Sequence, residues 1–300
     1  MTNVECSLGG ERVSLKDKCV FITGGSRGIG LAIALRVARD GANVVIASKT
    51  VEPHPKLAGT IHEAAELIEQ VGGRALAVQC DVRDEVQIDE AIEAAVARFG
   101  GIDALVNNAS AVSLSGTLGT KMSRYDLMND VNVRGTFATT RACLPYLLKA
   151  KNPHVVTLSP PLNFETRWFE PHVAYSISKY GMSLCMLGMA GEFRGRVGFN
   201  AIWPRTGIDT AAMNEFKKSG PYAFQHLRSP EIVADAVYLI LNSDARNVSG
   251  KFFVDDEVLA AHGVTDLSAY NPPGVADLDL SPDLFVPSLR EIEGRSGDVG

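Results

Sequence analysis

Short apolar runs rich in β-branched residues alternate with helix-like patterns along most of this chain, which limits the folds it can adopt. The predicted strands read CVFIT, NVVIAS, ALAVQCDV, DALVNNAS, HVVTLS, VGFNAIW and KFFVDD. The helical stretches between them are Ile29–Asp40, Ile61–Val71, Val86–Phe99, Tyr125–Lys151, Tyr175–Phe193 and Pro230–Asn242. Strands that are apolar throughout and alternate with helices are typical of a parallel sheet buried on both faces. The sequence predicts an α/β fold: one doubly wound parallel sheet of about seven strands, with helices on both faces.

The pattern also divides the chain. Residues 15–262 carry the alternation and are expected to form one domain, since α/β proteins of this length often do. We expect residues 1–14 to be a flexible N-terminal segment and residues 263–300, rich in Pro and Asp, to be an extended C-terminal tail. The apolar residues Leu284, Phe285 and Val286 leave two interpretations of the tail: it docks on a neighbouring subunit, or it is loose.

Composition excludes several classes of function. The net charge of −6 and the pI near 5.6, with no basic stripe, argue against nucleic acid as a main partner. No apolar run reaches the roughly 20 residues that a membrane span needs. The five cysteines are scattered without metal-type spacing, so no metal site is predicted. Scattered core thiols and a polar N-terminus are typical of a reduced, cytoplasmic protein.

The run TGGSRGIG follows the first predicted strand and leads into a helix. Gly24, Gly28 and Gly30 let the backbone turn tightly and approach a pyrophosphate at the helix N-terminus. A plain tight turn also needs glycine, but the strand before and the helix after favour a Rossmann-type dinucleotide site. The predicted cofactor-binding residues of this run are Thr23, Gly24, Ser26, Arg27, Gly28, Ile29 and Gly30.

The end of the second strand indicates which nicotinamide cofactor is preferred. NAD sites usually place an Asp or Glu there for the ribose 2′-hydroxyl, whereas a 2′-phosphate is met by a basic residue. This chain has Ser48 and Lys49 at that point and no acid, and Arg27 is a second candidate for phosphate pairing. Lys49 as a solvated surface lysine is the alternative. NADP(H) is therefore favoured over NAD(H).

Tyr175 and Lys179 stand four residues apart in AYSISKYGMS, so a helix places them on one face. A phenol titrates near 10 in water, and a neighbouring cation lowers that pKa into a useful range for proton transfer. Such a pair alone is common by chance in helices. Downstream of a dinucleotide-binding run, it predicts an oxidoreductase.

In this order, the motifs resemble the short-chain dehydrogenase/reductase family. They are TGGSRGIG, Asp81-Val82, NNAS at Asn107–Ser110, Asn132 in VNVRGTF, and YSISK, over roughly residues 15–254. Within the family, ASKTVEPHPKLAGTI, SPPLN and WPRTGIDTAAM are most similar to the hydroxysteroid dehydrogenase-like protein 2 branch. Animal members of that branch can carry a C-terminal sterol-carrier-like domain, which we do not expect in 300 residues.

The resemblance implies a catalytic set of Tyr175, Lys179, Asn132 and Ser159. Tyr175 would exchange a proton with the substrate oxygen. Lys179 would lower the pKa of Tyr175 and hold the nicotinamide ribose, while Asn132 would help to hold a relay water. A simpler reading of Asn132 is that it satisfies backbone groups inside a helix.

The resemblance also implies cofactor contacts outside the glycine run. Asp81 with Val82 would face the adenine, although Asp81 could instead cap a turn. Tyr175 and Lys179 would contact the nicotinamide side. The remaining implied contacts are Asn108, Ala109, Ser110, Pro204, Thr206 and Ile208.

One departure from the family pattern concerns the substrate. The family usually has two serines after the fifth strand, the second donating to the substrate oxygen; here they are Ser159 and Pro160. Proline has neither a side-chain donor nor an N–H. Three alternatives stay open: Ser159 donates, Asn163 substitutes, or no third donor exists.

The segment from Thr210 to about Leu227 is expected to form a lid. Aromatic and apolar residues gather near it: Trp168, Phe169, Trp203, Met213, Phe216, Tyr222 and Phe224. They favour an apolar lipid-, steroid- or acyl-like small-molecule substrate, although ordinary packing would also explain them.

The expected function is NADP(H)-dependent interconversion of a secondary alcohol and a ketone. The alternatives are an enoyl or dienoyl thioester reductase, and an NADP(H)-binding protein with little turnover. Family members pair through the helices equivalent to Tyr125–Lys151 and Tyr175–Phe193, so the resemblance implies a homodimer or homotetramer.

Overall fold

The computed structural model describes residues 14–53, 58–211, 213 and 224–297. Nearly all of the predicted flexible N-terminal segment lies outside these residues. So does most of the predicted lid, including Phe216 and Tyr222. None of the helices in the described ranges is long and apolar enough to cross a membrane.

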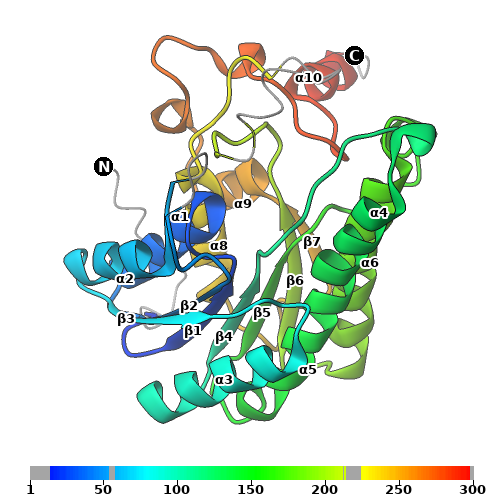
Figure 1. Ribbon diagram of the computed structural model, residues 1–300. Coiled ribbons are helices and arrows are strands. Elements are labelled where there is room, and N and C mark those ends of the chain that lie inside the picture. The colour runs from blue at the N-terminus through cyan, green and yellow to red at the C-terminus, as the bar shows by residue number, and fades with distance from the viewer. Residues whose placement is uncertain (1–13, 54–57, 212, 214–223, 298–300) are drawn as a thin grey trace.

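Seven strands form a single sheet in which every neighbouring pair is parallel (Figure 1). The order across the sheet is β3-β2-β1-β4-β5-β6-β7, so the chain crosses to the other half of the sheet after β3. The strands are β1 (Cys19–Thr23), β2 (Asn43–Ser48), β3 (Arg74–Gln79), β4 (Ala104–Asn107), β5 (His154–Leu158), β6 (Gly198–Trp203) and β7 (Lys251–Val254). The crossing between β1 and β4 opens a crevice at the carboxyl ends of the strands, where such folds bind ligands.

Helices cover both faces of the sheet, as the alternation of the sequence predicts (Figure 1). Alternate residues of β1 show why: Val20 and Ile22 pack on one side, while Phe21 packs on the other. The first face is covered by α1 (Gly28–Ala38), α2 (Ile61–Gln70), α8 (Glu231–Leu241) and α9 (Asp255–Ala261). The second is covered by α3 (Glu85–Phe99), α5 (Gly135–Leu147) and α6 (Val173–Glu192). The predicted α/β class is confirmed.

The long helix predicted over 125–151 is divided in the structure. It consists of α4 (Met122–Met128), a π-helical turn (Asn129–Arg134) and α5. The wide turn contains Asn132, whose fully buried side chain turns toward the loop after β4. A π turn accommodates one extra residue in a helix and is common at functional sites. Here it aligns Asn132 with backbone groups outside its own helix.

The C-terminal segment packs on the body of its own chain. Residues 263–297, predicted as part of an extended tail, contain 3-10 turns at Ser268–Tyr270 and Asp277–Asp279 and the helix α10 (Leu289–Gly297). The segment lies above the sheet in Figure 1. Apart from the apolar layers on the two faces of the sheet, the chain has a third apolar cluster. Phe285 and Val286 are buried in it together with Tyr175 and Trp203. The sequence had left two interpretations of this apolar triplet, docking on a neighbouring subunit or a loose tail, and neither describes this packing on the chain's own body.

Phe285 anchors the segment. Its side chain is 1% exposed, and its ring lies within about 6.4 Å (centroid to centroid) of five other rings: Trp168, His172, Tyr175, Tyr180 and Trp203. Its φ of 72° lies in the left-handed region, which a bulky residue adopts only when its surroundings impose it. Packing of the ring therefore fixes the backbone around it.

We expect Phe285→Ala to lower the free energy of unfolding by roughly 3–5 kcal/mol, because it opens a cavity in a closely packed cluster. The measurement is urea unfolding followed by circular dichroism. Phe164→Ala is the matched control: Phe164 is 75% exposed, so its loss should change the stability by less than about 1 kcal/mol. Equal effects of the two substitutions would show that Phe285 does not anchor the segment.

Candidate active site

The glycine run and the loop after β4 are locked together by hydrogen bonds. The Thr23 hydroxyl donates to the carbonyl of Val106 and accepts from the backbone N–H of Asn108 and Ala109. The Asn108 amide donates to the carbonyls of Thr23 and Gly24, at 3.0 Å each. A Cβ on Gly30 would lie 2.5 Å from the Asn108 side-chain nitrogen, so only glycine fits beneath this contact. The two loops form one rigid wall.

The N-terminus of α1 opens beside this wall. Gly28 begins the helix with φ +55°, a conformation that glycine adopts without strain. The preceding residue, Arg27, has no side-chain acceptor with which to cap the helix, and its guanidinium donates to the Gly59 carbonyl at 2.9 Å. Uncapped N–H groups at a helix start bind anions. The Ser26 and Ser48 hydroxyls, 3.3 Å apart, join this region to the end of β2.

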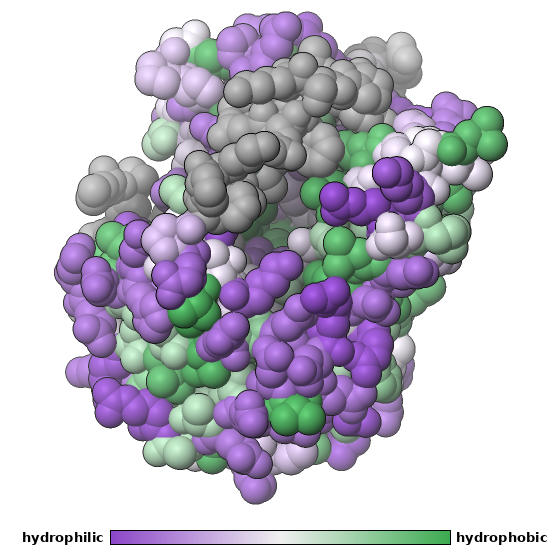
Figure 2. All heavy atoms as spheres, viewed as in Figure 1, coloured by the Kyte–Doolittle hydropathy of each residue, from purple (hydrophilic) through white to green (hydrophobic). Residues whose placement is uncertain are grey.

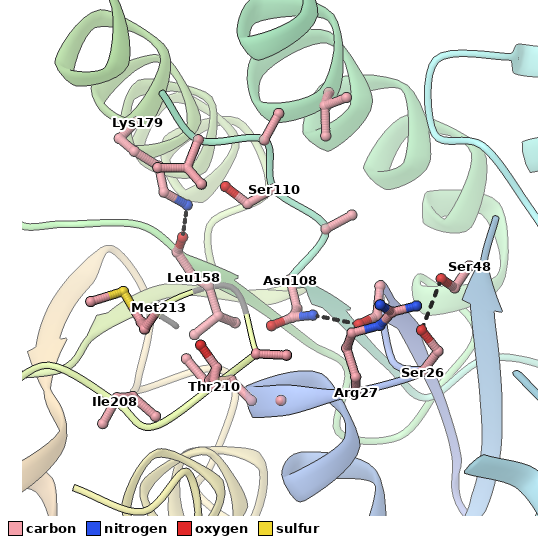
Figure 3. Close-up of a pocket in the computed structure, with 18 of the residues that line it drawn as sticks. Ser26, Arg27, Ser48, Asn108, Ser110, Leu158, Lys179, Ile208, Thr210 and Met213 are labelled. Atoms are coloured by element: carbon pink, nitrogen blue, oxygen red, sulfur yellow. Dashed lines mark hydrogen bonds between the residues drawn. The ribbon is translucent and has the colours of Figure 1, made fainter. Parts of the chain in front are cut away.

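A cavity of about 480 Å³ extends from the helix start across the carboxyl ends of the strands. Figure 3 shows Ser26, Ser48 and Arg27 at one end, Asn108 between, and Ser110 and Lys179 at the other. In Figure 2 this face is hollowed at its centre, with hydrophobic residues beside the hollow. The predicted residues that line the cavity are Gly24, Ser26, Arg27, Gly28, Ile29, Lys49, Asp81, Val82, Asn108, Ala109, Ser110, Tyr175, Lys179, Pro204 and Ile208.

Tyr175 and Lys179 meet at the end of the cavity away from the glycine run. They are 7% and 3% exposed, one turn apart on α6. The Lys179 ammonium donates to the Leu158 carbonyl at 2.8 Å and lies 5.1 Å from the centre of the Trp203 ring. Burial lowers the pKa of Lys179 to about 7, and burial together with the Asp283 carboxylate raises the pKa of Tyr175. The resemblance implies that Lys179 lowers the pKa of Tyr175, whereas the surroundings of Tyr175 in the structure raise it.

Five predicted site residues lie outside the lining: Thr23, Gly30, Asn132, Ser159 and Thr206. Thr23 and Gly30 shape the wall from behind. Asn132 pairs with both backbone groups of Ala111, and its amide also donates to the Ser178 hydroxyl at 2.9 Å. Asn132 thereby ties the loop after β4 to α6. Its backbone partners lie outside its own helix, so this arrangement differs from the simpler reading, in which Asn132 satisfies backbone groups inside a helix. Thr206 is buried, and its backbone pairs with Pro282 of the C-terminal segment.

The loop after β5 presents no side-chain donor to the cavity. The Ser159 hydroxyl is fully buried without a hydrogen-bond partner among the described residues, and it does not reach the lining. Pro160 has no donor. The Asn163 side chain bonds to Glu165, and its backbone carbonyl accepts from the Tyr180 hydroxyl. The donor expected from this loop is therefore not brought to the cavity by either residue.

Charged residues stand near the end of β2 and of β3. Asp81 accepts hydrogen bonds from Arg83 through both carboxyl oxygens, and these bonds lower its pKa. Its backbone N–H is bound by the Gln87 side chain at 2.9 Å. Lys49 is exposed and lines the cavity, and its charge contributes to lowering the pKa of Asp81. The cavity therefore has a cation at the end of β2, where the sequence lacks an acid.

Among the cavity residues that sequence reasoning missed are Asp283 and Leu284 of the C-terminal segment. They lie more than a hundred residues beyond Tyr175, in a stretch without periodicity. The only sequence signal was the apolar triplet at 284–286. Also unforeseen was the role of Arg205: its buried guanidinium pairs with Asp256 and Glu257 at the start of α9, at 2.5 Å each.

The Tyr175 end of the cavity is mainly apolar. The side chains that line it and its approaches include Val112, Leu114, Leu127, Val131, Leu158, Trp203, Met213, Phe224 and Leu284. Of the aromatic residues expected around the substrate, Trp168 and Phe169 pack behind Tyr175 in the third apolar cluster instead of lining the cavity. An apolar chamber with a few convergent polar groups is typical of a small-molecule site.

Comparison with known proteins agrees with this geometry. A family model described as short chain dehydrogenase matches residues 18–220. Hydroxysteroid dehydrogenase-like protein 2 of Danio rerio is 54% identical over 273 residues, which are 91% of this chain and 64% of that protein. The chain thus spans less than two thirds of the length of this curated relative.

Solved structures give the same result. A crystal structure from Xanthomonas campestris has a TM-score of 0.86 and 52% identity, covering 92% of this chain and all of that one. A short chain dehydrogenase from Mycobacterium thermoresistibile has a TM-score of 0.85 and 47% identity, covering 92% of this chain and 97% of that one. The glycine run, the buried tyrosine–lysine pair and these matches agree: the chain belongs to the short-chain dehydrogenase/reductase family.

Proposed function

We propose that this chain is an NADP(H)-dependent oxidoreductase that interconverts a secondary alcohol and a ketone on an apolar substrate. The observation that carries the proposal is one cavity that begins at the start of α1 and ends in an apolar chamber at Tyr175 and Lys179. The nicotinamide would supply or accept the hydride. The residues of the chain bind, orient and exchange the proton.

Within this proposal, each end of the cavity has its own task. The uncapped start of α1, with Ser26 and Arg27, holds the pyrophosphate. Lys179 holds the nicotinamide ribose, and its charge is available to assist Tyr175 when the phenol loses its proton. Tyr175 bonds to the reacting oxygen and gives it a proton in the reduction. Burial of both side chains strengthens their electrostatic interaction with a bound molecule.

We expect Tyr175→Phe to bind NADPH normally and to lose roughly 10²- to 10⁴-fold in kcat, since it removes only the proton donor. NADPH oxidation is followed by absorbance with a panel of ketones, acyl-CoAs and enoyl-CoAs, and binding by titration calorimetry. Tyr146→Phe, which removes the same oxygen far from the cavity, is the control. Unchanged turnover in Tyr175→Phe would contradict the proposal.

The same panel separates the alternatives. An enoyl or dienoyl thioester reductase would turn over enoyl-CoAs and leave ketones untouched. A protein that binds NADP(H) with little turnover is favoured by one observation, the absence of Ser159 from the lining. It predicts NADPH binding without oxidation for any compound of the panel.

NADP(H) is proposed over NAD(H) because Lys49 lines the cavity at the end of β2, where NAD sites usually carry an acid. Arg27 lies close by, in the glycine run. A phosphate bound between two cations gains charge-assisted hydrogen bonds that a hydroxyl does not gain.

We expect Lys49→Ala to weaken NADPH binding by roughly 10- to 100-fold, the loss of one charged hydrogen bond, and to leave NADH binding nearly unchanged. Titration calorimetry with both cofactors measures this. Lys121→Ala, an exposed lysine outside the cavity, serves as the control. Equal weakening of both cofactors by Lys49→Ala would remove the basis for the NADP(H) preference.

We further propose a homodimer or homotetramer that pairs through α5 and α6. Ile177, Leu184 and Leu187 are 43%, 56% and 41% exposed, on one side of α6, and Phe137 of α5 is 51% exposed. Large apolar side chains grouped in this way are usual in interfaces between copies of a chain.

Leu184→Glu is expected to shift the assembly toward monomers, because it buries a charge in the proposed interface. Sedimentation velocity gives the mass. The control is Leu118→Glu, at a fully exposed position in the 3-10 turn Thr117–Gly119, which should leave the mass unchanged. A wild-type chain that sediments as a monomer would contradict the proposed pairing.

The cytosol is the proposed compartment. Cys19, Cys80, Cys143 and Cys185 are free thiols, and burial raises their pKa values, to about 12 for Cys19 and Cys80. Free, unreactive thiols are typical of a reducing environment.

A further inference from the structure

The chamber around Tyr175 lacks the donor that the loop after β5 was expected to supply. Ser159 lies outside the lining, and Pro160 has no donor. Around Tyr175 and Lys179 in the described part of the chain, the other polar side chains of the lining include Ser110, Asp283 and Trp203, and the Trp203 indole N–H is already bound to the Leu284 carbonyl. Lys179 already donates to the Leu158 carbonyl.

Asp283 reaches the chamber because the C-terminal segment runs along the loop after β6. Its backbone N–H donates to the Arg205 carbonyl at 3.0 Å. The Trp203 indole donates to the Leu284 carbonyl at 2.7 Å, and Gly207 donates to the Ser281 carbonyl at 2.9 Å. Hydrogen bonds on both sides of Asp283 therefore fix its position over the cavity.

The next residues hold this position from behind. Phe285 fills the space between the rings of Tyr175 and Trp203, at centroid distances of 6.1 and 5.7 Å. Asp283 lines the cavity while Phe285, two residues later and in a left-handed conformation, is buried in the core. A strained conformation maintained by packing keeps its neighbours in one arrangement, as functional groups require.

The Asp283 carboxyl is placed to act on a ligand. One of its oxygens accepts from the Leu284 N–H at 2.6 Å, and the other has no hydrogen-bond partner among the described residues. A carboxyl group has a second oxygen that accepts when ionised and donates when protonated. The chamber therefore contains one polar group whose bonding capacity the protein itself leaves unused.

Burial and the charged neighbours together set the pKa of the Asp283 carboxyl. Lys179 and Tyr175 face it from α6, and Asp255 faces it from the start of α9. The Arg205 guanidinium, in the loop beside it, is engaged by Asp256 and Glu257. Burial and the Asp255 carboxylate raise the pKa of Asp283 to about 7, against the opposing effect of Lys179. The protonated form is thus accessible near neutral pH.

We propose that Asp283 is a catalytic residue that donates a hydrogen bond to the reacting oxygen of the substrate, beside Tyr175, and replaces the missing serine. This rests on the proposed carbonyl chemistry. A protonated carboxyl kept in an apolar site can act as such a donor, whereas a carboxylate would repel the developing oxyanion. Tyr175 still gives the proton, and Asp283 keeps its own.

The full chain and its variants are compared in NADPH-dependent ketone reduction. Asp283→Ala should lose roughly 10²- to 10³-fold in kcat, the usual effect of removing one donor, with NADPH affinity unchanged. Asp283→Asn, which donates at every pH, should stay within roughly 10-fold of wild type. In wild type, kcat/KM should fall as pH rises through the Asp283 pKa, because the donor loses its proton. Asp283→Asn should lack that fall.

Control variants distinguish the role of Asp283 from the proposed oxidoreductase function. Asp279→Asn makes the same change at an exposed carboxyl of the same segment and should not alter kcat. A Tyr175→Phe variant that retains its rate would overturn the proposed function. If Tyr175→Phe loses its activity while Asp283→Ala keeps the wild-type kcat, only the role of Asp283 is overturned. Loss of rate in Ser110→Ala but not in Asp283→Ala would assign the donor to Ser110 and also overturn it.

A second readout does not depend on turnover. The infrared difference spectrum between wild type and Asp283→Asn should contain the carbonyl stretch of a protonated carboxyl at pH 6 and lose it by pH 9. The NADPH-bound protein is used, so that the site is in its working state. Absence of that band at pH 6 would overturn the proposal. So would a kinetic result in which Asp283→Asn is as slow as Asp283→Ala and the wild-type rate rises with pH.

Discussion

The burial of Tyr175 and Lys179 side by side is the constraint on which the rest of the site depends. Both are almost completely removed from water, and no carboxylate of the described residues is bonded to the ammonium. In such surroundings each charge is costly, which is why the pKa of the lysine falls and that of the tyrosine rises. The Asp283 charge raises the pKa of both Tyr175 and Lys179, so the proton positions on the three groups influence one another. A bound nucleotide would enter this balance and change it.

The two ends of the cavity are built differently. The end of the cavity at the start of α1, where we propose that the nucleotide binds, is the nucleotide end. It is formed by contiguous motifs, and hydrogen bonds of Thr23 and Asn108 join the glycine run to the loop after β4. The chamber around Tyr175 is assembled from loops and from a C-terminal segment that contacts Trp203 and Arg205. Because the nucleotide end is rigid and the chamber is made of loops, changes in the loops can alter the substrate specificity without changing the sheet.

Features that depend on contiguous motifs could be predicted from the sequence, whereas features that depend on contacts between distant segments could not. The strands, the helices and the glycine run depend on local patterns, so their positions could be predicted, and the helix spacing of Tyr175 and Lys179 placed both in the cavity. The π turn around Asn132 and the seclusion of Ser159 arise from contacts with distant residues, which spacing does not reveal. Asp283 is the clearest case: its position depends on how Phe285 packs among rings from three other segments. The apolar triplet at 284–286 suggests that this stretch docks, but it does not indicate which rings Phe285 meets.

A crystal structure of the full chain with NADP⁺ and a bound alcohol or ketone from the reduction panel would show directly whether Tyr175 and Asp283 bind the reacting oxygen together. We expect the reacting oxygen to lie within hydrogen-bond distance, about 2.6–3.2 Å, of both the Tyr175 hydroxyl and the Asp283 carboxyl. A reacting oxygen held elsewhere, with Tyr175 bonded only to protein groups, would contradict it.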